Sequence, residues 1–376
     1  MNTRYAPPGA NPEAAPERHL SGAALRGINI GLNVVVRVAA VRTERERRAM
    51  IWLTNYARLQ GLTADALSER IGLSQDDIRS ALTDPDIDLR PFVRAVEGAR
   101  ANFEKCIPQL VRTAVTRDVL EAIGYAGETP GIVEIIGHNR TGKTESAWYQ
   151  FLRLLDRALW IDCPEDDSDR TFLFEIARAA GIGTGTNKKP DQLRAQVKAI
   201  FGDPGISVLF VDEAHRLWPS NPRTKPKRIE FLRSLVDAGK PPKVSVIVIA
   251  TEQFAESLEA ALDKSSRWAP GQWQGRAQRW VLPETLSDAE LASVARHHAP
   301  DAPEEAIRSL VLQAKASQGF CGIMVNTIRR ARFIGRGKVT RESVDRAQIQ
   351  IARGTKLEQA AQAKAIAARL KQGGRR

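Results

Sequence analysis

The sequence predicts an α/β protein with a parallel sheet covered by helices on both faces and an all-helical region ahead of it. Two observations support this prediction. Short apolar runs rich in β-branched residues recur at residues 132–136, 158–162, 206–212 and 244–250. Amphipathic segments separate these runs, and this alternation is typical of parallel sheets because each crossover connection carries a helix.

The size and charge of the chain restrict its function. Its 376 residues are enough for two or three domains, and 43% of them are hydrophobic, which is ample for a core. The net charge of +12 and the isoelectric point near 9.9 indicate a polyanionic partner, with nucleic acid the first candidate and an acidic membrane surface the second. No apolar run approaches the ~18 residues of a spanning helix, so we expect no membrane insertion.

Cysteine usage indicates a reducing compartment. Cys106, Cys163 and Cys321 are far apart and lack metal-ligand spacing, so we expect reduced, buried thiols. The opening segment, MNTRYAPPGANPEAAPERHL, has no apolar core and does not fit a secretory signal. Both observations predict a cytoplasmic protein.

The run at residues 132–136 leads into the spacing Gly-x-x-x-x-Gly-Lys-Thr, which is typical of phosphate loops. Glycines allow backbone N–H groups to face phosphate oxygens, a lysine supplies positive charge, and a threonine hydroxyl is a Mg²⁺ ligand. A helix from Thr144 to about Asp156 would direct its positive dipole end at the same phosphates. The alternative is a glycine-rich turn with an incidental lysine. The predicted cofactors are ATP and Mg²⁺, bound by Gly137, His138, Asn139, Arg140, Thr141, Gly142, Lys143 and Thr144.

Polar residues follow two later strands. The apolar run ending at residue 212 closes with Asp212 and Glu213. Downstream of a phosphate loop, Asp212 is placed to hold Mg²⁺ and Glu213 to orient and deprotonate the attacking water. Thr251 follows the run at residues 244–250 and is expected either to contact the γ-phosphate or water, or to cap the next helix.

Residues 62–82 predict two short helices. Thr63 and Ser74 are N-cap residues, and Gly72 breaks the chain between the helices, ahead of a buried Leu73. This stretch resembles a repressor-type helix-turn-helix, whose second helix would present Gln75 and Arg79 to DNA. Asp76 and Asp77 oppose DNA binding because carboxylates repel phosphates, so a protein-docking role stays open.

The order of these motifs resembles an AAA+ ATPase over about Ile107 to Arg353. Within that family, the N-terminal helical domain and the segment Ala250–Gln253 (ATEQ) resemble transposition target-selector ATPases of the phage Mu B type. The resemblance implies a homo-oligomer, as a ring or a helical filament, with double-stranded DNA and a transposase as partners. It also implies an arginine finger supplied by a neighbouring subunit, for which Arg276 is favoured over Arg279 and Arg267.

Domain boundaries follow from the same comparison. We expect a flexible arm at 1–48, a helix-turn-helix domain at 49–105, a nucleotide-binding domain at 106–286, a helical lid at 287–352 and a basic tail at 353–376. Within the arm, residues 28–41 are compatible with a docking strand or with the start of a solvated helix. A helix is expected from Pro108 to Tyr125, and lid helices at 288–298, 304–316 and 323–334.

Two features depart from the family pattern. A Gly-x-x-Arg sensor usually begins a lid helix, but Gly319-Phe320-Cys321-Gly322 has no arginine there, and Arg329 and Arg330 come late. Hydrolysis is therefore expected to be slow or stimulated by a partner. His138, Asn139 and Arg140 also make the phosphate loop bulkier and more basic than usual.

Basic residues follow the Asp-Glu strand in the run RTKPKR, residues 223–228. The resemblance implies that this loop faces DNA, with Lys225, Lys227 and Arg228 as contacts, whereas a solvated charged loop is the simpler interpretation. The sequence as a whole predicts an ATP-dependent, largely sequence-tolerant DNA-binding ATPase that recruits or activates a transposase. The alternatives are a helicase- or replication-loader ATPase and a non-catalytic nucleotide switch in signalling or secretion.

Overall fold

The structure, a computed structural model, describes residues 30–183, 189–202, 205–221, 224–238, 243–263, 271–316 and 320–352. It divides into two compact units. The first holds the described residues up to Leu110 together with Arg117–Gly137 and Lys143–Leu282, and the second holds Val111–Thr116, His138–Gly142 and the described residues from Pro283 onward. The predicted basic tail lies outside the described residues. Among those described, no helix is long and apolar enough to cross a membrane.

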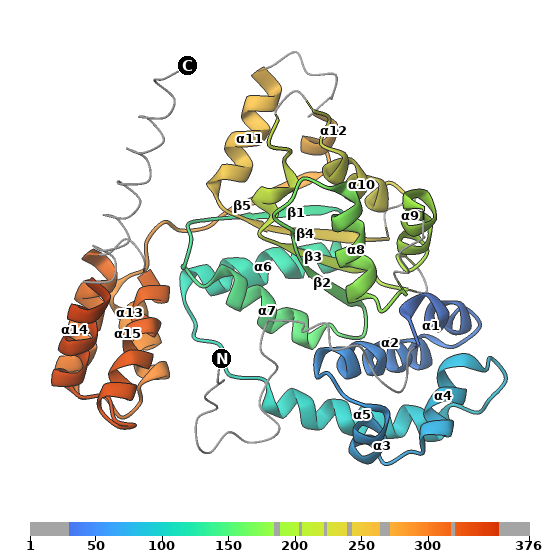
Figure 1. Cartoon of the computed structure of the whole chain (residues 1–376), viewed down its shortest axis with the longest axis horizontal. Helices are drawn as coiled ribbons and strands as arrows, with labels where there is room; N and C mark the ends of the chain where they lie inside the picture. The colour runs from blue at the N-terminus through green and yellow to red at the C-terminus, as the bar shows by residue number, and fades with distance from the viewer. Residues whose placement is uncertain are drawn as a thin grey trace, which may run out of the picture. The chain divides into compact units, whose positions relative to one another are not determined.

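One sheet of parallel strands forms the centre of the first unit, in the order β2-β3-β4-β1-β5 (Figure 1). The strands are β1 (Ile132–Ile136), β2 (Ala158–Asp162), β3 (Val208–Asp212), β4 (Ser245–Ala250) and β5 (Ala277–Val281). Every residue of β1, β3 and β4 is buried, as expected of apolar strands covered on both faces. The predicted fold class is confirmed.

Helices join the strands and flank the sheet. They are α6 (Ala114–Glu128), α7 (Lys143–Arg153), α8 (Asp169–Ala179), α9 (Pro190–Lys198), the 3-10 helix η1 (Ala214–Leu217), α10 (Lys227–Val236), α11 (Glu252–Asp263) and α12 (Gly271–Gln274). The apolar face of α7 packs on the sheet, where the Trp148 ring lies 5.0 Å from that of Trp160. Helix α6 begins at Ala114 rather than at Pro108, because the Thr113 hydroxyl accepts the Thr116 N–H at 3.1 Å and so fixes the helix start.

Five helices precede the sheet: α1 (Leu32–Ala39), α2 (Glu44–Leu59), α3 (Ala64–Ile71), α4 (Gln75–Thr83) and α5 (Arg90–Cys106). The Thr63 and Ser74 side chains cap α3 and α4 as predicted, and Gly72 ends α3 with a left-handed φ of 70°. Leu73 is half-buried rather than buried. The two capped helices are therefore confirmed, whereas their use as a DNA-reading motif stays a prediction.

The predicted flexible arm is wrong for residues 30–48. Leu32, Val35, Val36 and Ala39 are buried along one face of α1, and α2 begins at Glu44 within a capping box made by Thr43. The Leu32 N–H also donates to the Ala180 carbonyl at 2.9 Å. Three consecutive valines favour a strand locally. The burial of the four residues that line one face of α1 outweighs that propensity.

A buried carboxylate joins these N-terminal helices to the nucleotide domain. Asp156, 2% exposed, lies in the turn between α7 and β2 and pairs with Arg48 of α2 at 3.2 Å and Arg100 of α5 at 3.3 Å. Nearby, the Asn55 amide donates to the Leu155 carbonyl at 2.8 Å and the Ala158 carbonyl at 3.1 Å. These bonds pack the helical region against the sheet domain.

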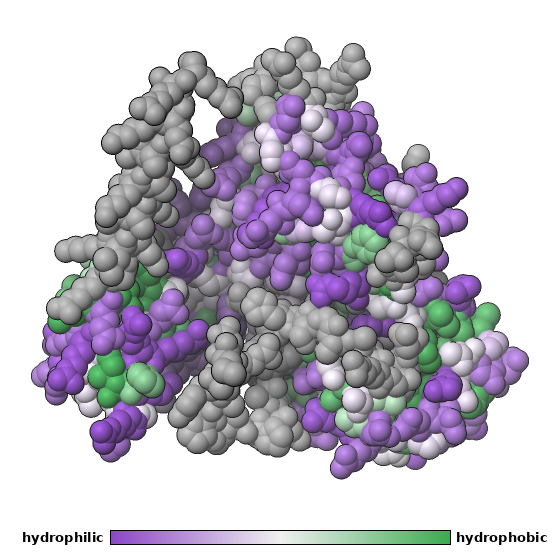
Figure 2. Space-filling model, viewed as in Figure 1, coloured by the Kyte–Doolittle hydropathy of each residue, from purple (hydrophilic) through white to green (hydrophobic). Residues whose placement is uncertain are grey.

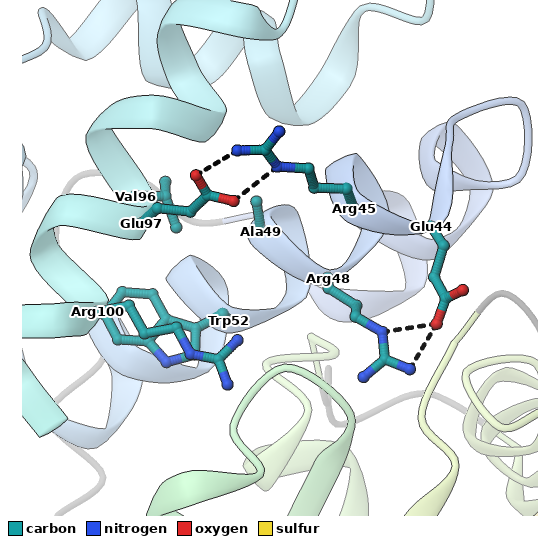
Figure 3. Close-up of a pocket in the computed structure, with 8 residues that line it drawn as sticks. All are labelled: Glu44, Arg45, Arg48, Ala49, Trp52, Val96, Glu97 and Arg100. Carbon is teal, nitrogen blue, oxygen red and sulfur yellow. Dashed lines mark hydrogen bonds and ion pairs between the residues drawn. The ribbon is translucent and has the colours of Figure 1, made fainter.

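A pocket of about 460 Å³ lies between α2 and α5 and is lined by Glu44, Arg45, Arg48, Ala49, Trp52, Val96, Glu97 and Arg100 (Figure 3). Its charged groups bond to one another. The Arg45 guanidinium donates to both oxygens of Glu97, at 2.7 and 2.6 Å, and Arg48 pairs with Glu44 at 2.6 Å. The pocket is thus a neutralised contact between two helices.

The second unit contains the predicted lid helices α13 (Asp288–His298), α14 (Glu304–Ala316) and α15 (Phe320–Ile334), and residues 341–352 are also helical. Ser287 and Glu290 form a capping box at the start of α13, as the Ser-x-x-Glu spacing favours. The three predicted helices are confirmed, except that α15 begins three residues before Ile323, and their role as a lid stays a prediction.

The prediction of reduced, buried thiols is confirmed only in part. All three are free, and burial raises the pKa of Cys163 to about 12. Cys106 and Cys321 are half-buried rather than buried.

Replacing Asp156 by alanine is expected to lower the free energy of unfolding by about 2–3 kcal/mol, because the basic side chains around it lose their buried counter-charge. Urea denaturation followed by tryptophan fluorescence measures this. The matched control is Glu97→Ala, which breaks an exposed pair and is expected to cost less than about 1 kcal/mol. Equal losses in the two variants would contradict the anchoring role of Asp156.

Candidate active site

The predicted phosphate loop connects β1 to α7. Neither of its two fixed glycines could be replaced by a larger residue without a clash or backbone strain. A Cβ added to Gly137 would lie 2.9 Å from the Leu282 Cβ, and the Gly137 N–H donates to the Ala250 carbonyl at 3.2 Å. Gly142 has a φ of 98°, which side-chain-bearing residues rarely adopt. Helix α7 begins at Lys143, directly after this turn, so the N-terminal end of its dipole faces the loop.

The middle of the loop lies in the second unit. Asn139 and Arg140 are exposed, His138 is half-buried, and the buried Thr141 hydroxyl donates to the His138 carbonyl at 3.0 Å. Arg140 has a positive φ of 66°, and its carbonyl accepts the Gly322 N–H at 3.3 Å.

Gly322 is the position at which the family pattern has an arginine. A Cβ there would lie 2.8 Å from the Arg140 Cβ, so the Arg140 side chain occupies the space that a side chain at 322 would need.

The end of the loop places a cation, Lys143, near carboxylates of the first unit. Lys143 is 6% exposed, and burial lowers its pKa, while Asp212, Glu213 and Glu252 act in the opposite direction. The Thr144 hydroxyl donates to Asp212 Oδ1 at 3.4 Å. The carboxylate, the lysine and the hydroxyl therefore lie together, as the sequence predicts.

Glu213 follows β3 in a left-handed conformation with a φ of 51°, which is strained for a residue with a side chain. Its N–H donates to Asp212 Oδ1 at 2.9 Å. Glu213 Oε2 lies 3.4 Å from His215 Nδ1, and burial lowers the pKa of His215. The sequence analysis missed His215, although the Asp-Glu-Ala-His order could have indicated it.

Thr251 lies at the carboxyl end of β4, next to the residue that pairs with Ile136. It is 6% exposed, and its Oγ1 is buried without a hydrogen-bond partner among the described residues. The alternative that this hydroxyl caps α11 is therefore not seen. A buried hydroxyl without a partner carries a desolvation cost that a bound ligand would remove.

Arg276, the favoured arginine-finger candidate, lies far from the loop of its own chain. The Arg276 carbonyl accepts the Ile132 N–H, at the opposite end of β1, and a strand of this length spans roughly 16 Å. The Arg276 side chain pairs with Asp237 at 2.5 Å and donates to the Gln272 carbonyl at 2.8 Å. Arg267 lies outside the described residues.

Arg279 is engaged within the sheet. It pairs at 2.6 Å with Glu134, which is 1% exposed and also accepts the Trp273 indole N–H at 2.6 Å. Removing Arg279 would leave a buried carboxylate short of a partner, so this arginine is the weaker finger candidate.

The prediction that Arg228 contacts DNA is wrong. Arg228 is 4% exposed and donates to the carbonyls of Arg216 at 3.1 Å and Ser168 at 3.0 Å, and to that of Asp166. It ties the start of α10 to the acidic loop after β2. A charge run in a sequence does not reveal such partners, because two of them, Asp166 and Ser168, lie about sixty residues away along the chain.

The other predicted DNA contacts are accessible but mostly paired. Lys225 lies 3.4 Å from Glu230, Lys227 lies 3.5 Å from Asp169, and the Gln75 amide donates to Asp65. Arg79 is exposed on α4. The structure brings none of these residues to the phosphate loop, and their contact with DNA stays a prediction.

Residues 126–258 match the protein family described as AAA domain. This match covers the loop, Asp212, Glu213 and Thr251, and it accompanies a sheet of order β2-β3-β4-β1-β5. The fold is that of an AAA+ P-loop NTPase.

Solved structures with similar folds include the Thermotoga maritima RuvB Holliday junction branch migration motor, at 14% identity and a TM-score of 0.39, covering 62% of this chain and 67% of the other. The FIGL-1 AAA domain matches at 16% identity and a TM-score of 0.37, covering 63% of this chain and 77% of the other. A comparison with curated proteins finds no match.

This fold typically binds a nucleotide and Mg²⁺, and the residues fit both. Gly142 has the backbone conformation of a phosphate-facing turn, Lys143 supplies charge at the start of α7, and the Thr251 hydroxyl lacks a partner. Thr144 and Asp212 supply the oxygens that Mg²⁺ prefers. The described residues hold no cluster of three or more His, Cys, Asp or Glu side chains suited to a metal.

Thr251→Val is expected to leave the free energy of unfolding unchanged or raised, because the lost hydroxyl makes no hydrogen bond, while ATP turnover falls about tenfold or more. Chemical denaturation and phosphate release measure the two effects. The control is Thr327→Val in the lid, whose hydroxyl bonds to Ile323 and Gln313 at 2.9 Å. This change should lower stability by about 1–2 kcal/mol. Full turnover in Thr251→Val would exclude a role for its hydroxyl.

Proposed function

We propose that this chain is an ATPase that binds DNA in an ATP-dependent, largely sequence-tolerant way, oligomerises on it, and recruits or activates a transposase at target sites. The observation that carries the catalytic part is the meeting of Lys143, Thr144 and Asp212 at the carboxyl edge of the sheet, with the Thr144 hydroxyl 3.4 Å from Asp212. DNA binding is supported by the net charge of +12. The transposase is supported by the motif resemblance.

Each site residue has a distinct role. Lys143 and the loop N–H groups bind the β- and γ-phosphates, and Thr144 with Asp212 hold Mg²⁺. Glu213 accepts a proton from the attacking water, and His215 lies beside it, with its Nδ1 3.4 Å from Glu213 Oε2. Thr251 donates its unused hydroxyl hydrogen to the γ-phosphate or to that water. Bound Mg–ATP supplies the phosphoanhydride bond that is hydrolysed.

Arg276 is proposed to complete the site of a neighbouring subunit. It lies at the opposite edge of the sheet from the loop of its own chain, so it cannot act there. Its pair with Asp237 is only partly buried, with the two side chains 38% and 35% exposed, and such a pair contributes at most about 1 kcal/mol. The guanidinium can therefore exchange Asp237 for a phosphate when subunits assemble into a ring or filament.

A loader ATPase with a protein partner is the second candidate. The observation in its favour is that Asp76 and Asp77 are exposed in the first turn of α4, where a DNA-reading helix would meet phosphates. A pull-down that recovers a replicative helicase, and no transposase, would favour this function. The absence of a lid arginine at Gly322 supports the third candidate, a nucleotide switch without turnover.

Nucleotide control of DNA binding is the first test. Wild-type protein is expected to retain duplex DNA on filters with ATP and to lose it with ADP or without nucleotide. Lys143→Ala should lose ATP-dependent retention because its phosphate contact is gone, whereas Glu213→Gln should retain DNA but not release phosphate. Arg346→Ala, which alters an exposed pair with Glu342, is the control. Equal retention by wild-type protein in all nucleotide states would overturn the proposal.

Mixing subunits of two variants tests the proposed role of Arg276 as an arginine finger. Arg276→Ala should lower ATP turnover by roughly 10³-fold or more, as loss of an arginine finger does in phosphate-loop enzymes. Lys143→Ala should also be inactive, yet a mixture of the two inactive variants is expected to regain turnover. In a mixed interface, one subunit supplies an intact loop and the other an intact arginine. Turnover that stays absent in the mixture would argue against a site shared between subunits.

A further inference from the structure

We propose that the exposed face of α15 and the turn after it form a phosphate-binding surface for DNA. This lid surface consists of Arg329, Arg330, Phe333, Arg336 and Lys338. The inference rests on the proposed function, which makes DNA the partner, and it locates the contact in the second unit, whereas the sequence predicts one in the run at residues 223–228.

Helix α15 separates buried and exposed residues cleanly. Met324, Thr327, Ile328 and Ala331 are buried, none of them more than 1% exposed. On a helix with 3.6 residues per turn, the opposite face presents Arg329, Arg330 and Phe333, and all three are exposed. Arg329 and Phe333, spaced i and i+4, are neighbours on that face.

The charge of this segment is one-sided. Residues 320–340 contain Arg329, Arg330, Arg332, Arg336 and Lys338 and no aspartate or glutamate. Arg332 lies 3.9 Å from Asp301 and donates to the His298 carbonyl at 2.7 Å. Within the described part of the chain, the other four basic side chains form no ion pair. They differ in this from Lys225 and Lys227, whose charges are already partly neutralised.

The turn after α15 holds its two basic residues on a defined backbone. The Gly335 N–H donates to the Ala331 carbonyl and the Gly337 N–H to the Arg332 carbonyl, both at 2.8 Å. Val339 then re-enters the core at 1% exposure, and its N–H donates to Asp301 at 3.3 Å. Arg336 and Lys338 therefore project from a short loop anchored at both ends, which lowers the entropy cost of binding.

An aromatic side chain lies among these cations. Phe333 is 84% exposed on α15. In the view of Figure 2, apolar side chains lie among hydrophilic ones over the lid helices. An exposed aromatic ring next to arginines is a combination that nucleic-acid-binding proteins use, because the ring contacts bases or sugars while the guanidinium groups bind phosphates. The absence of acidic residues in the segment favours a polyanion over a protein partner of mixed charge.

Fluorescence anisotropy with labelled duplex and single-stranded oligonucleotides, in the presence of ATP and over a salt series, tests the surface. The double variant Arg329→Ala/Arg330→Ala is expected to bind about tenfold or more weakly, with a salt slope smaller by about 2, since each lost phosphate contact removes about 0.9 from the slope. Phe333→Ala should weaken binding without changing the slope. The matched control Arg296→Ala, which alters an exposed lid pair with Glu304, should bind as wild type.

Other outcomes would overturn the inference. Unchanged affinity and slope in the double variant, with wild type binding normally, would exclude this surface while leaving the proposed function intact. No binding by wild type would instead remove the proposed function. If the double variant no longer forms oligomers in sedimentation experiments without DNA, the lid surface is instead a contact between copies of this chain. If the double variant loses the ATP turnover that is measured without DNA, Arg329 and Arg330 instead act in nucleotide sensing.

Discussion

Parallel pairing of β1 with β4, and of β4 with β3, is the constraint on which the site depends. It places Ile136 opposite Ala250, and the phosphate loop, Asp212 and Thr251 consequently leave the sheet at the same edge. The Gly137 N–H donates to the Ala250 carbonyl at 3.2 Å and continues this pairing into the loop. The side chains of the candidate site thus take their positions from backbone hydrogen bonds among the buried strands β1, β3 and β4, which shift little because their loss would be costly.

Features that depend on local chemistry could be predicted from the sequence. The loop glycines, the caps made by Thr63 and Ser74, and the capping box at Ser287 each follow from a few adjacent residues, and the structure contains all of them. The buried strands were predictable because their apolar residues run almost without interruption, with Glu134 the one exception within β1.

Features that depend on distant partners could not be predicted. Helix α1 is stabilised by burial and by a bond to Ala180, far along the chain, so the sequence left a docking strand and the start of a solvated helix both open. Arg228 resembles a solvent-facing cation in the sequence, but carbonyl groups from a distant loop enclose it. The position of His215 beside Glu213 depends on the left-handed turn at Glu213, which an L-residue rarely adopts and a sequence pattern does not reveal.

The location of Asp156 has a mechanical consequence. Helix α7 is an eleven-residue rod, about 16 Å long, with Lys143 at one end and the turn that holds Asp156 just beyond the other. Because an α-helix resists bending over so short a length, a tilt imposed on it at the triphosphate would reach that turn almost undiminished. Arg48 and Arg100 both pair with the Asp156 carboxylate, so α2 and α5 would move with that turn. A movement of the phosphate-binding end of α7 would therefore be transmitted to the N-terminal helices.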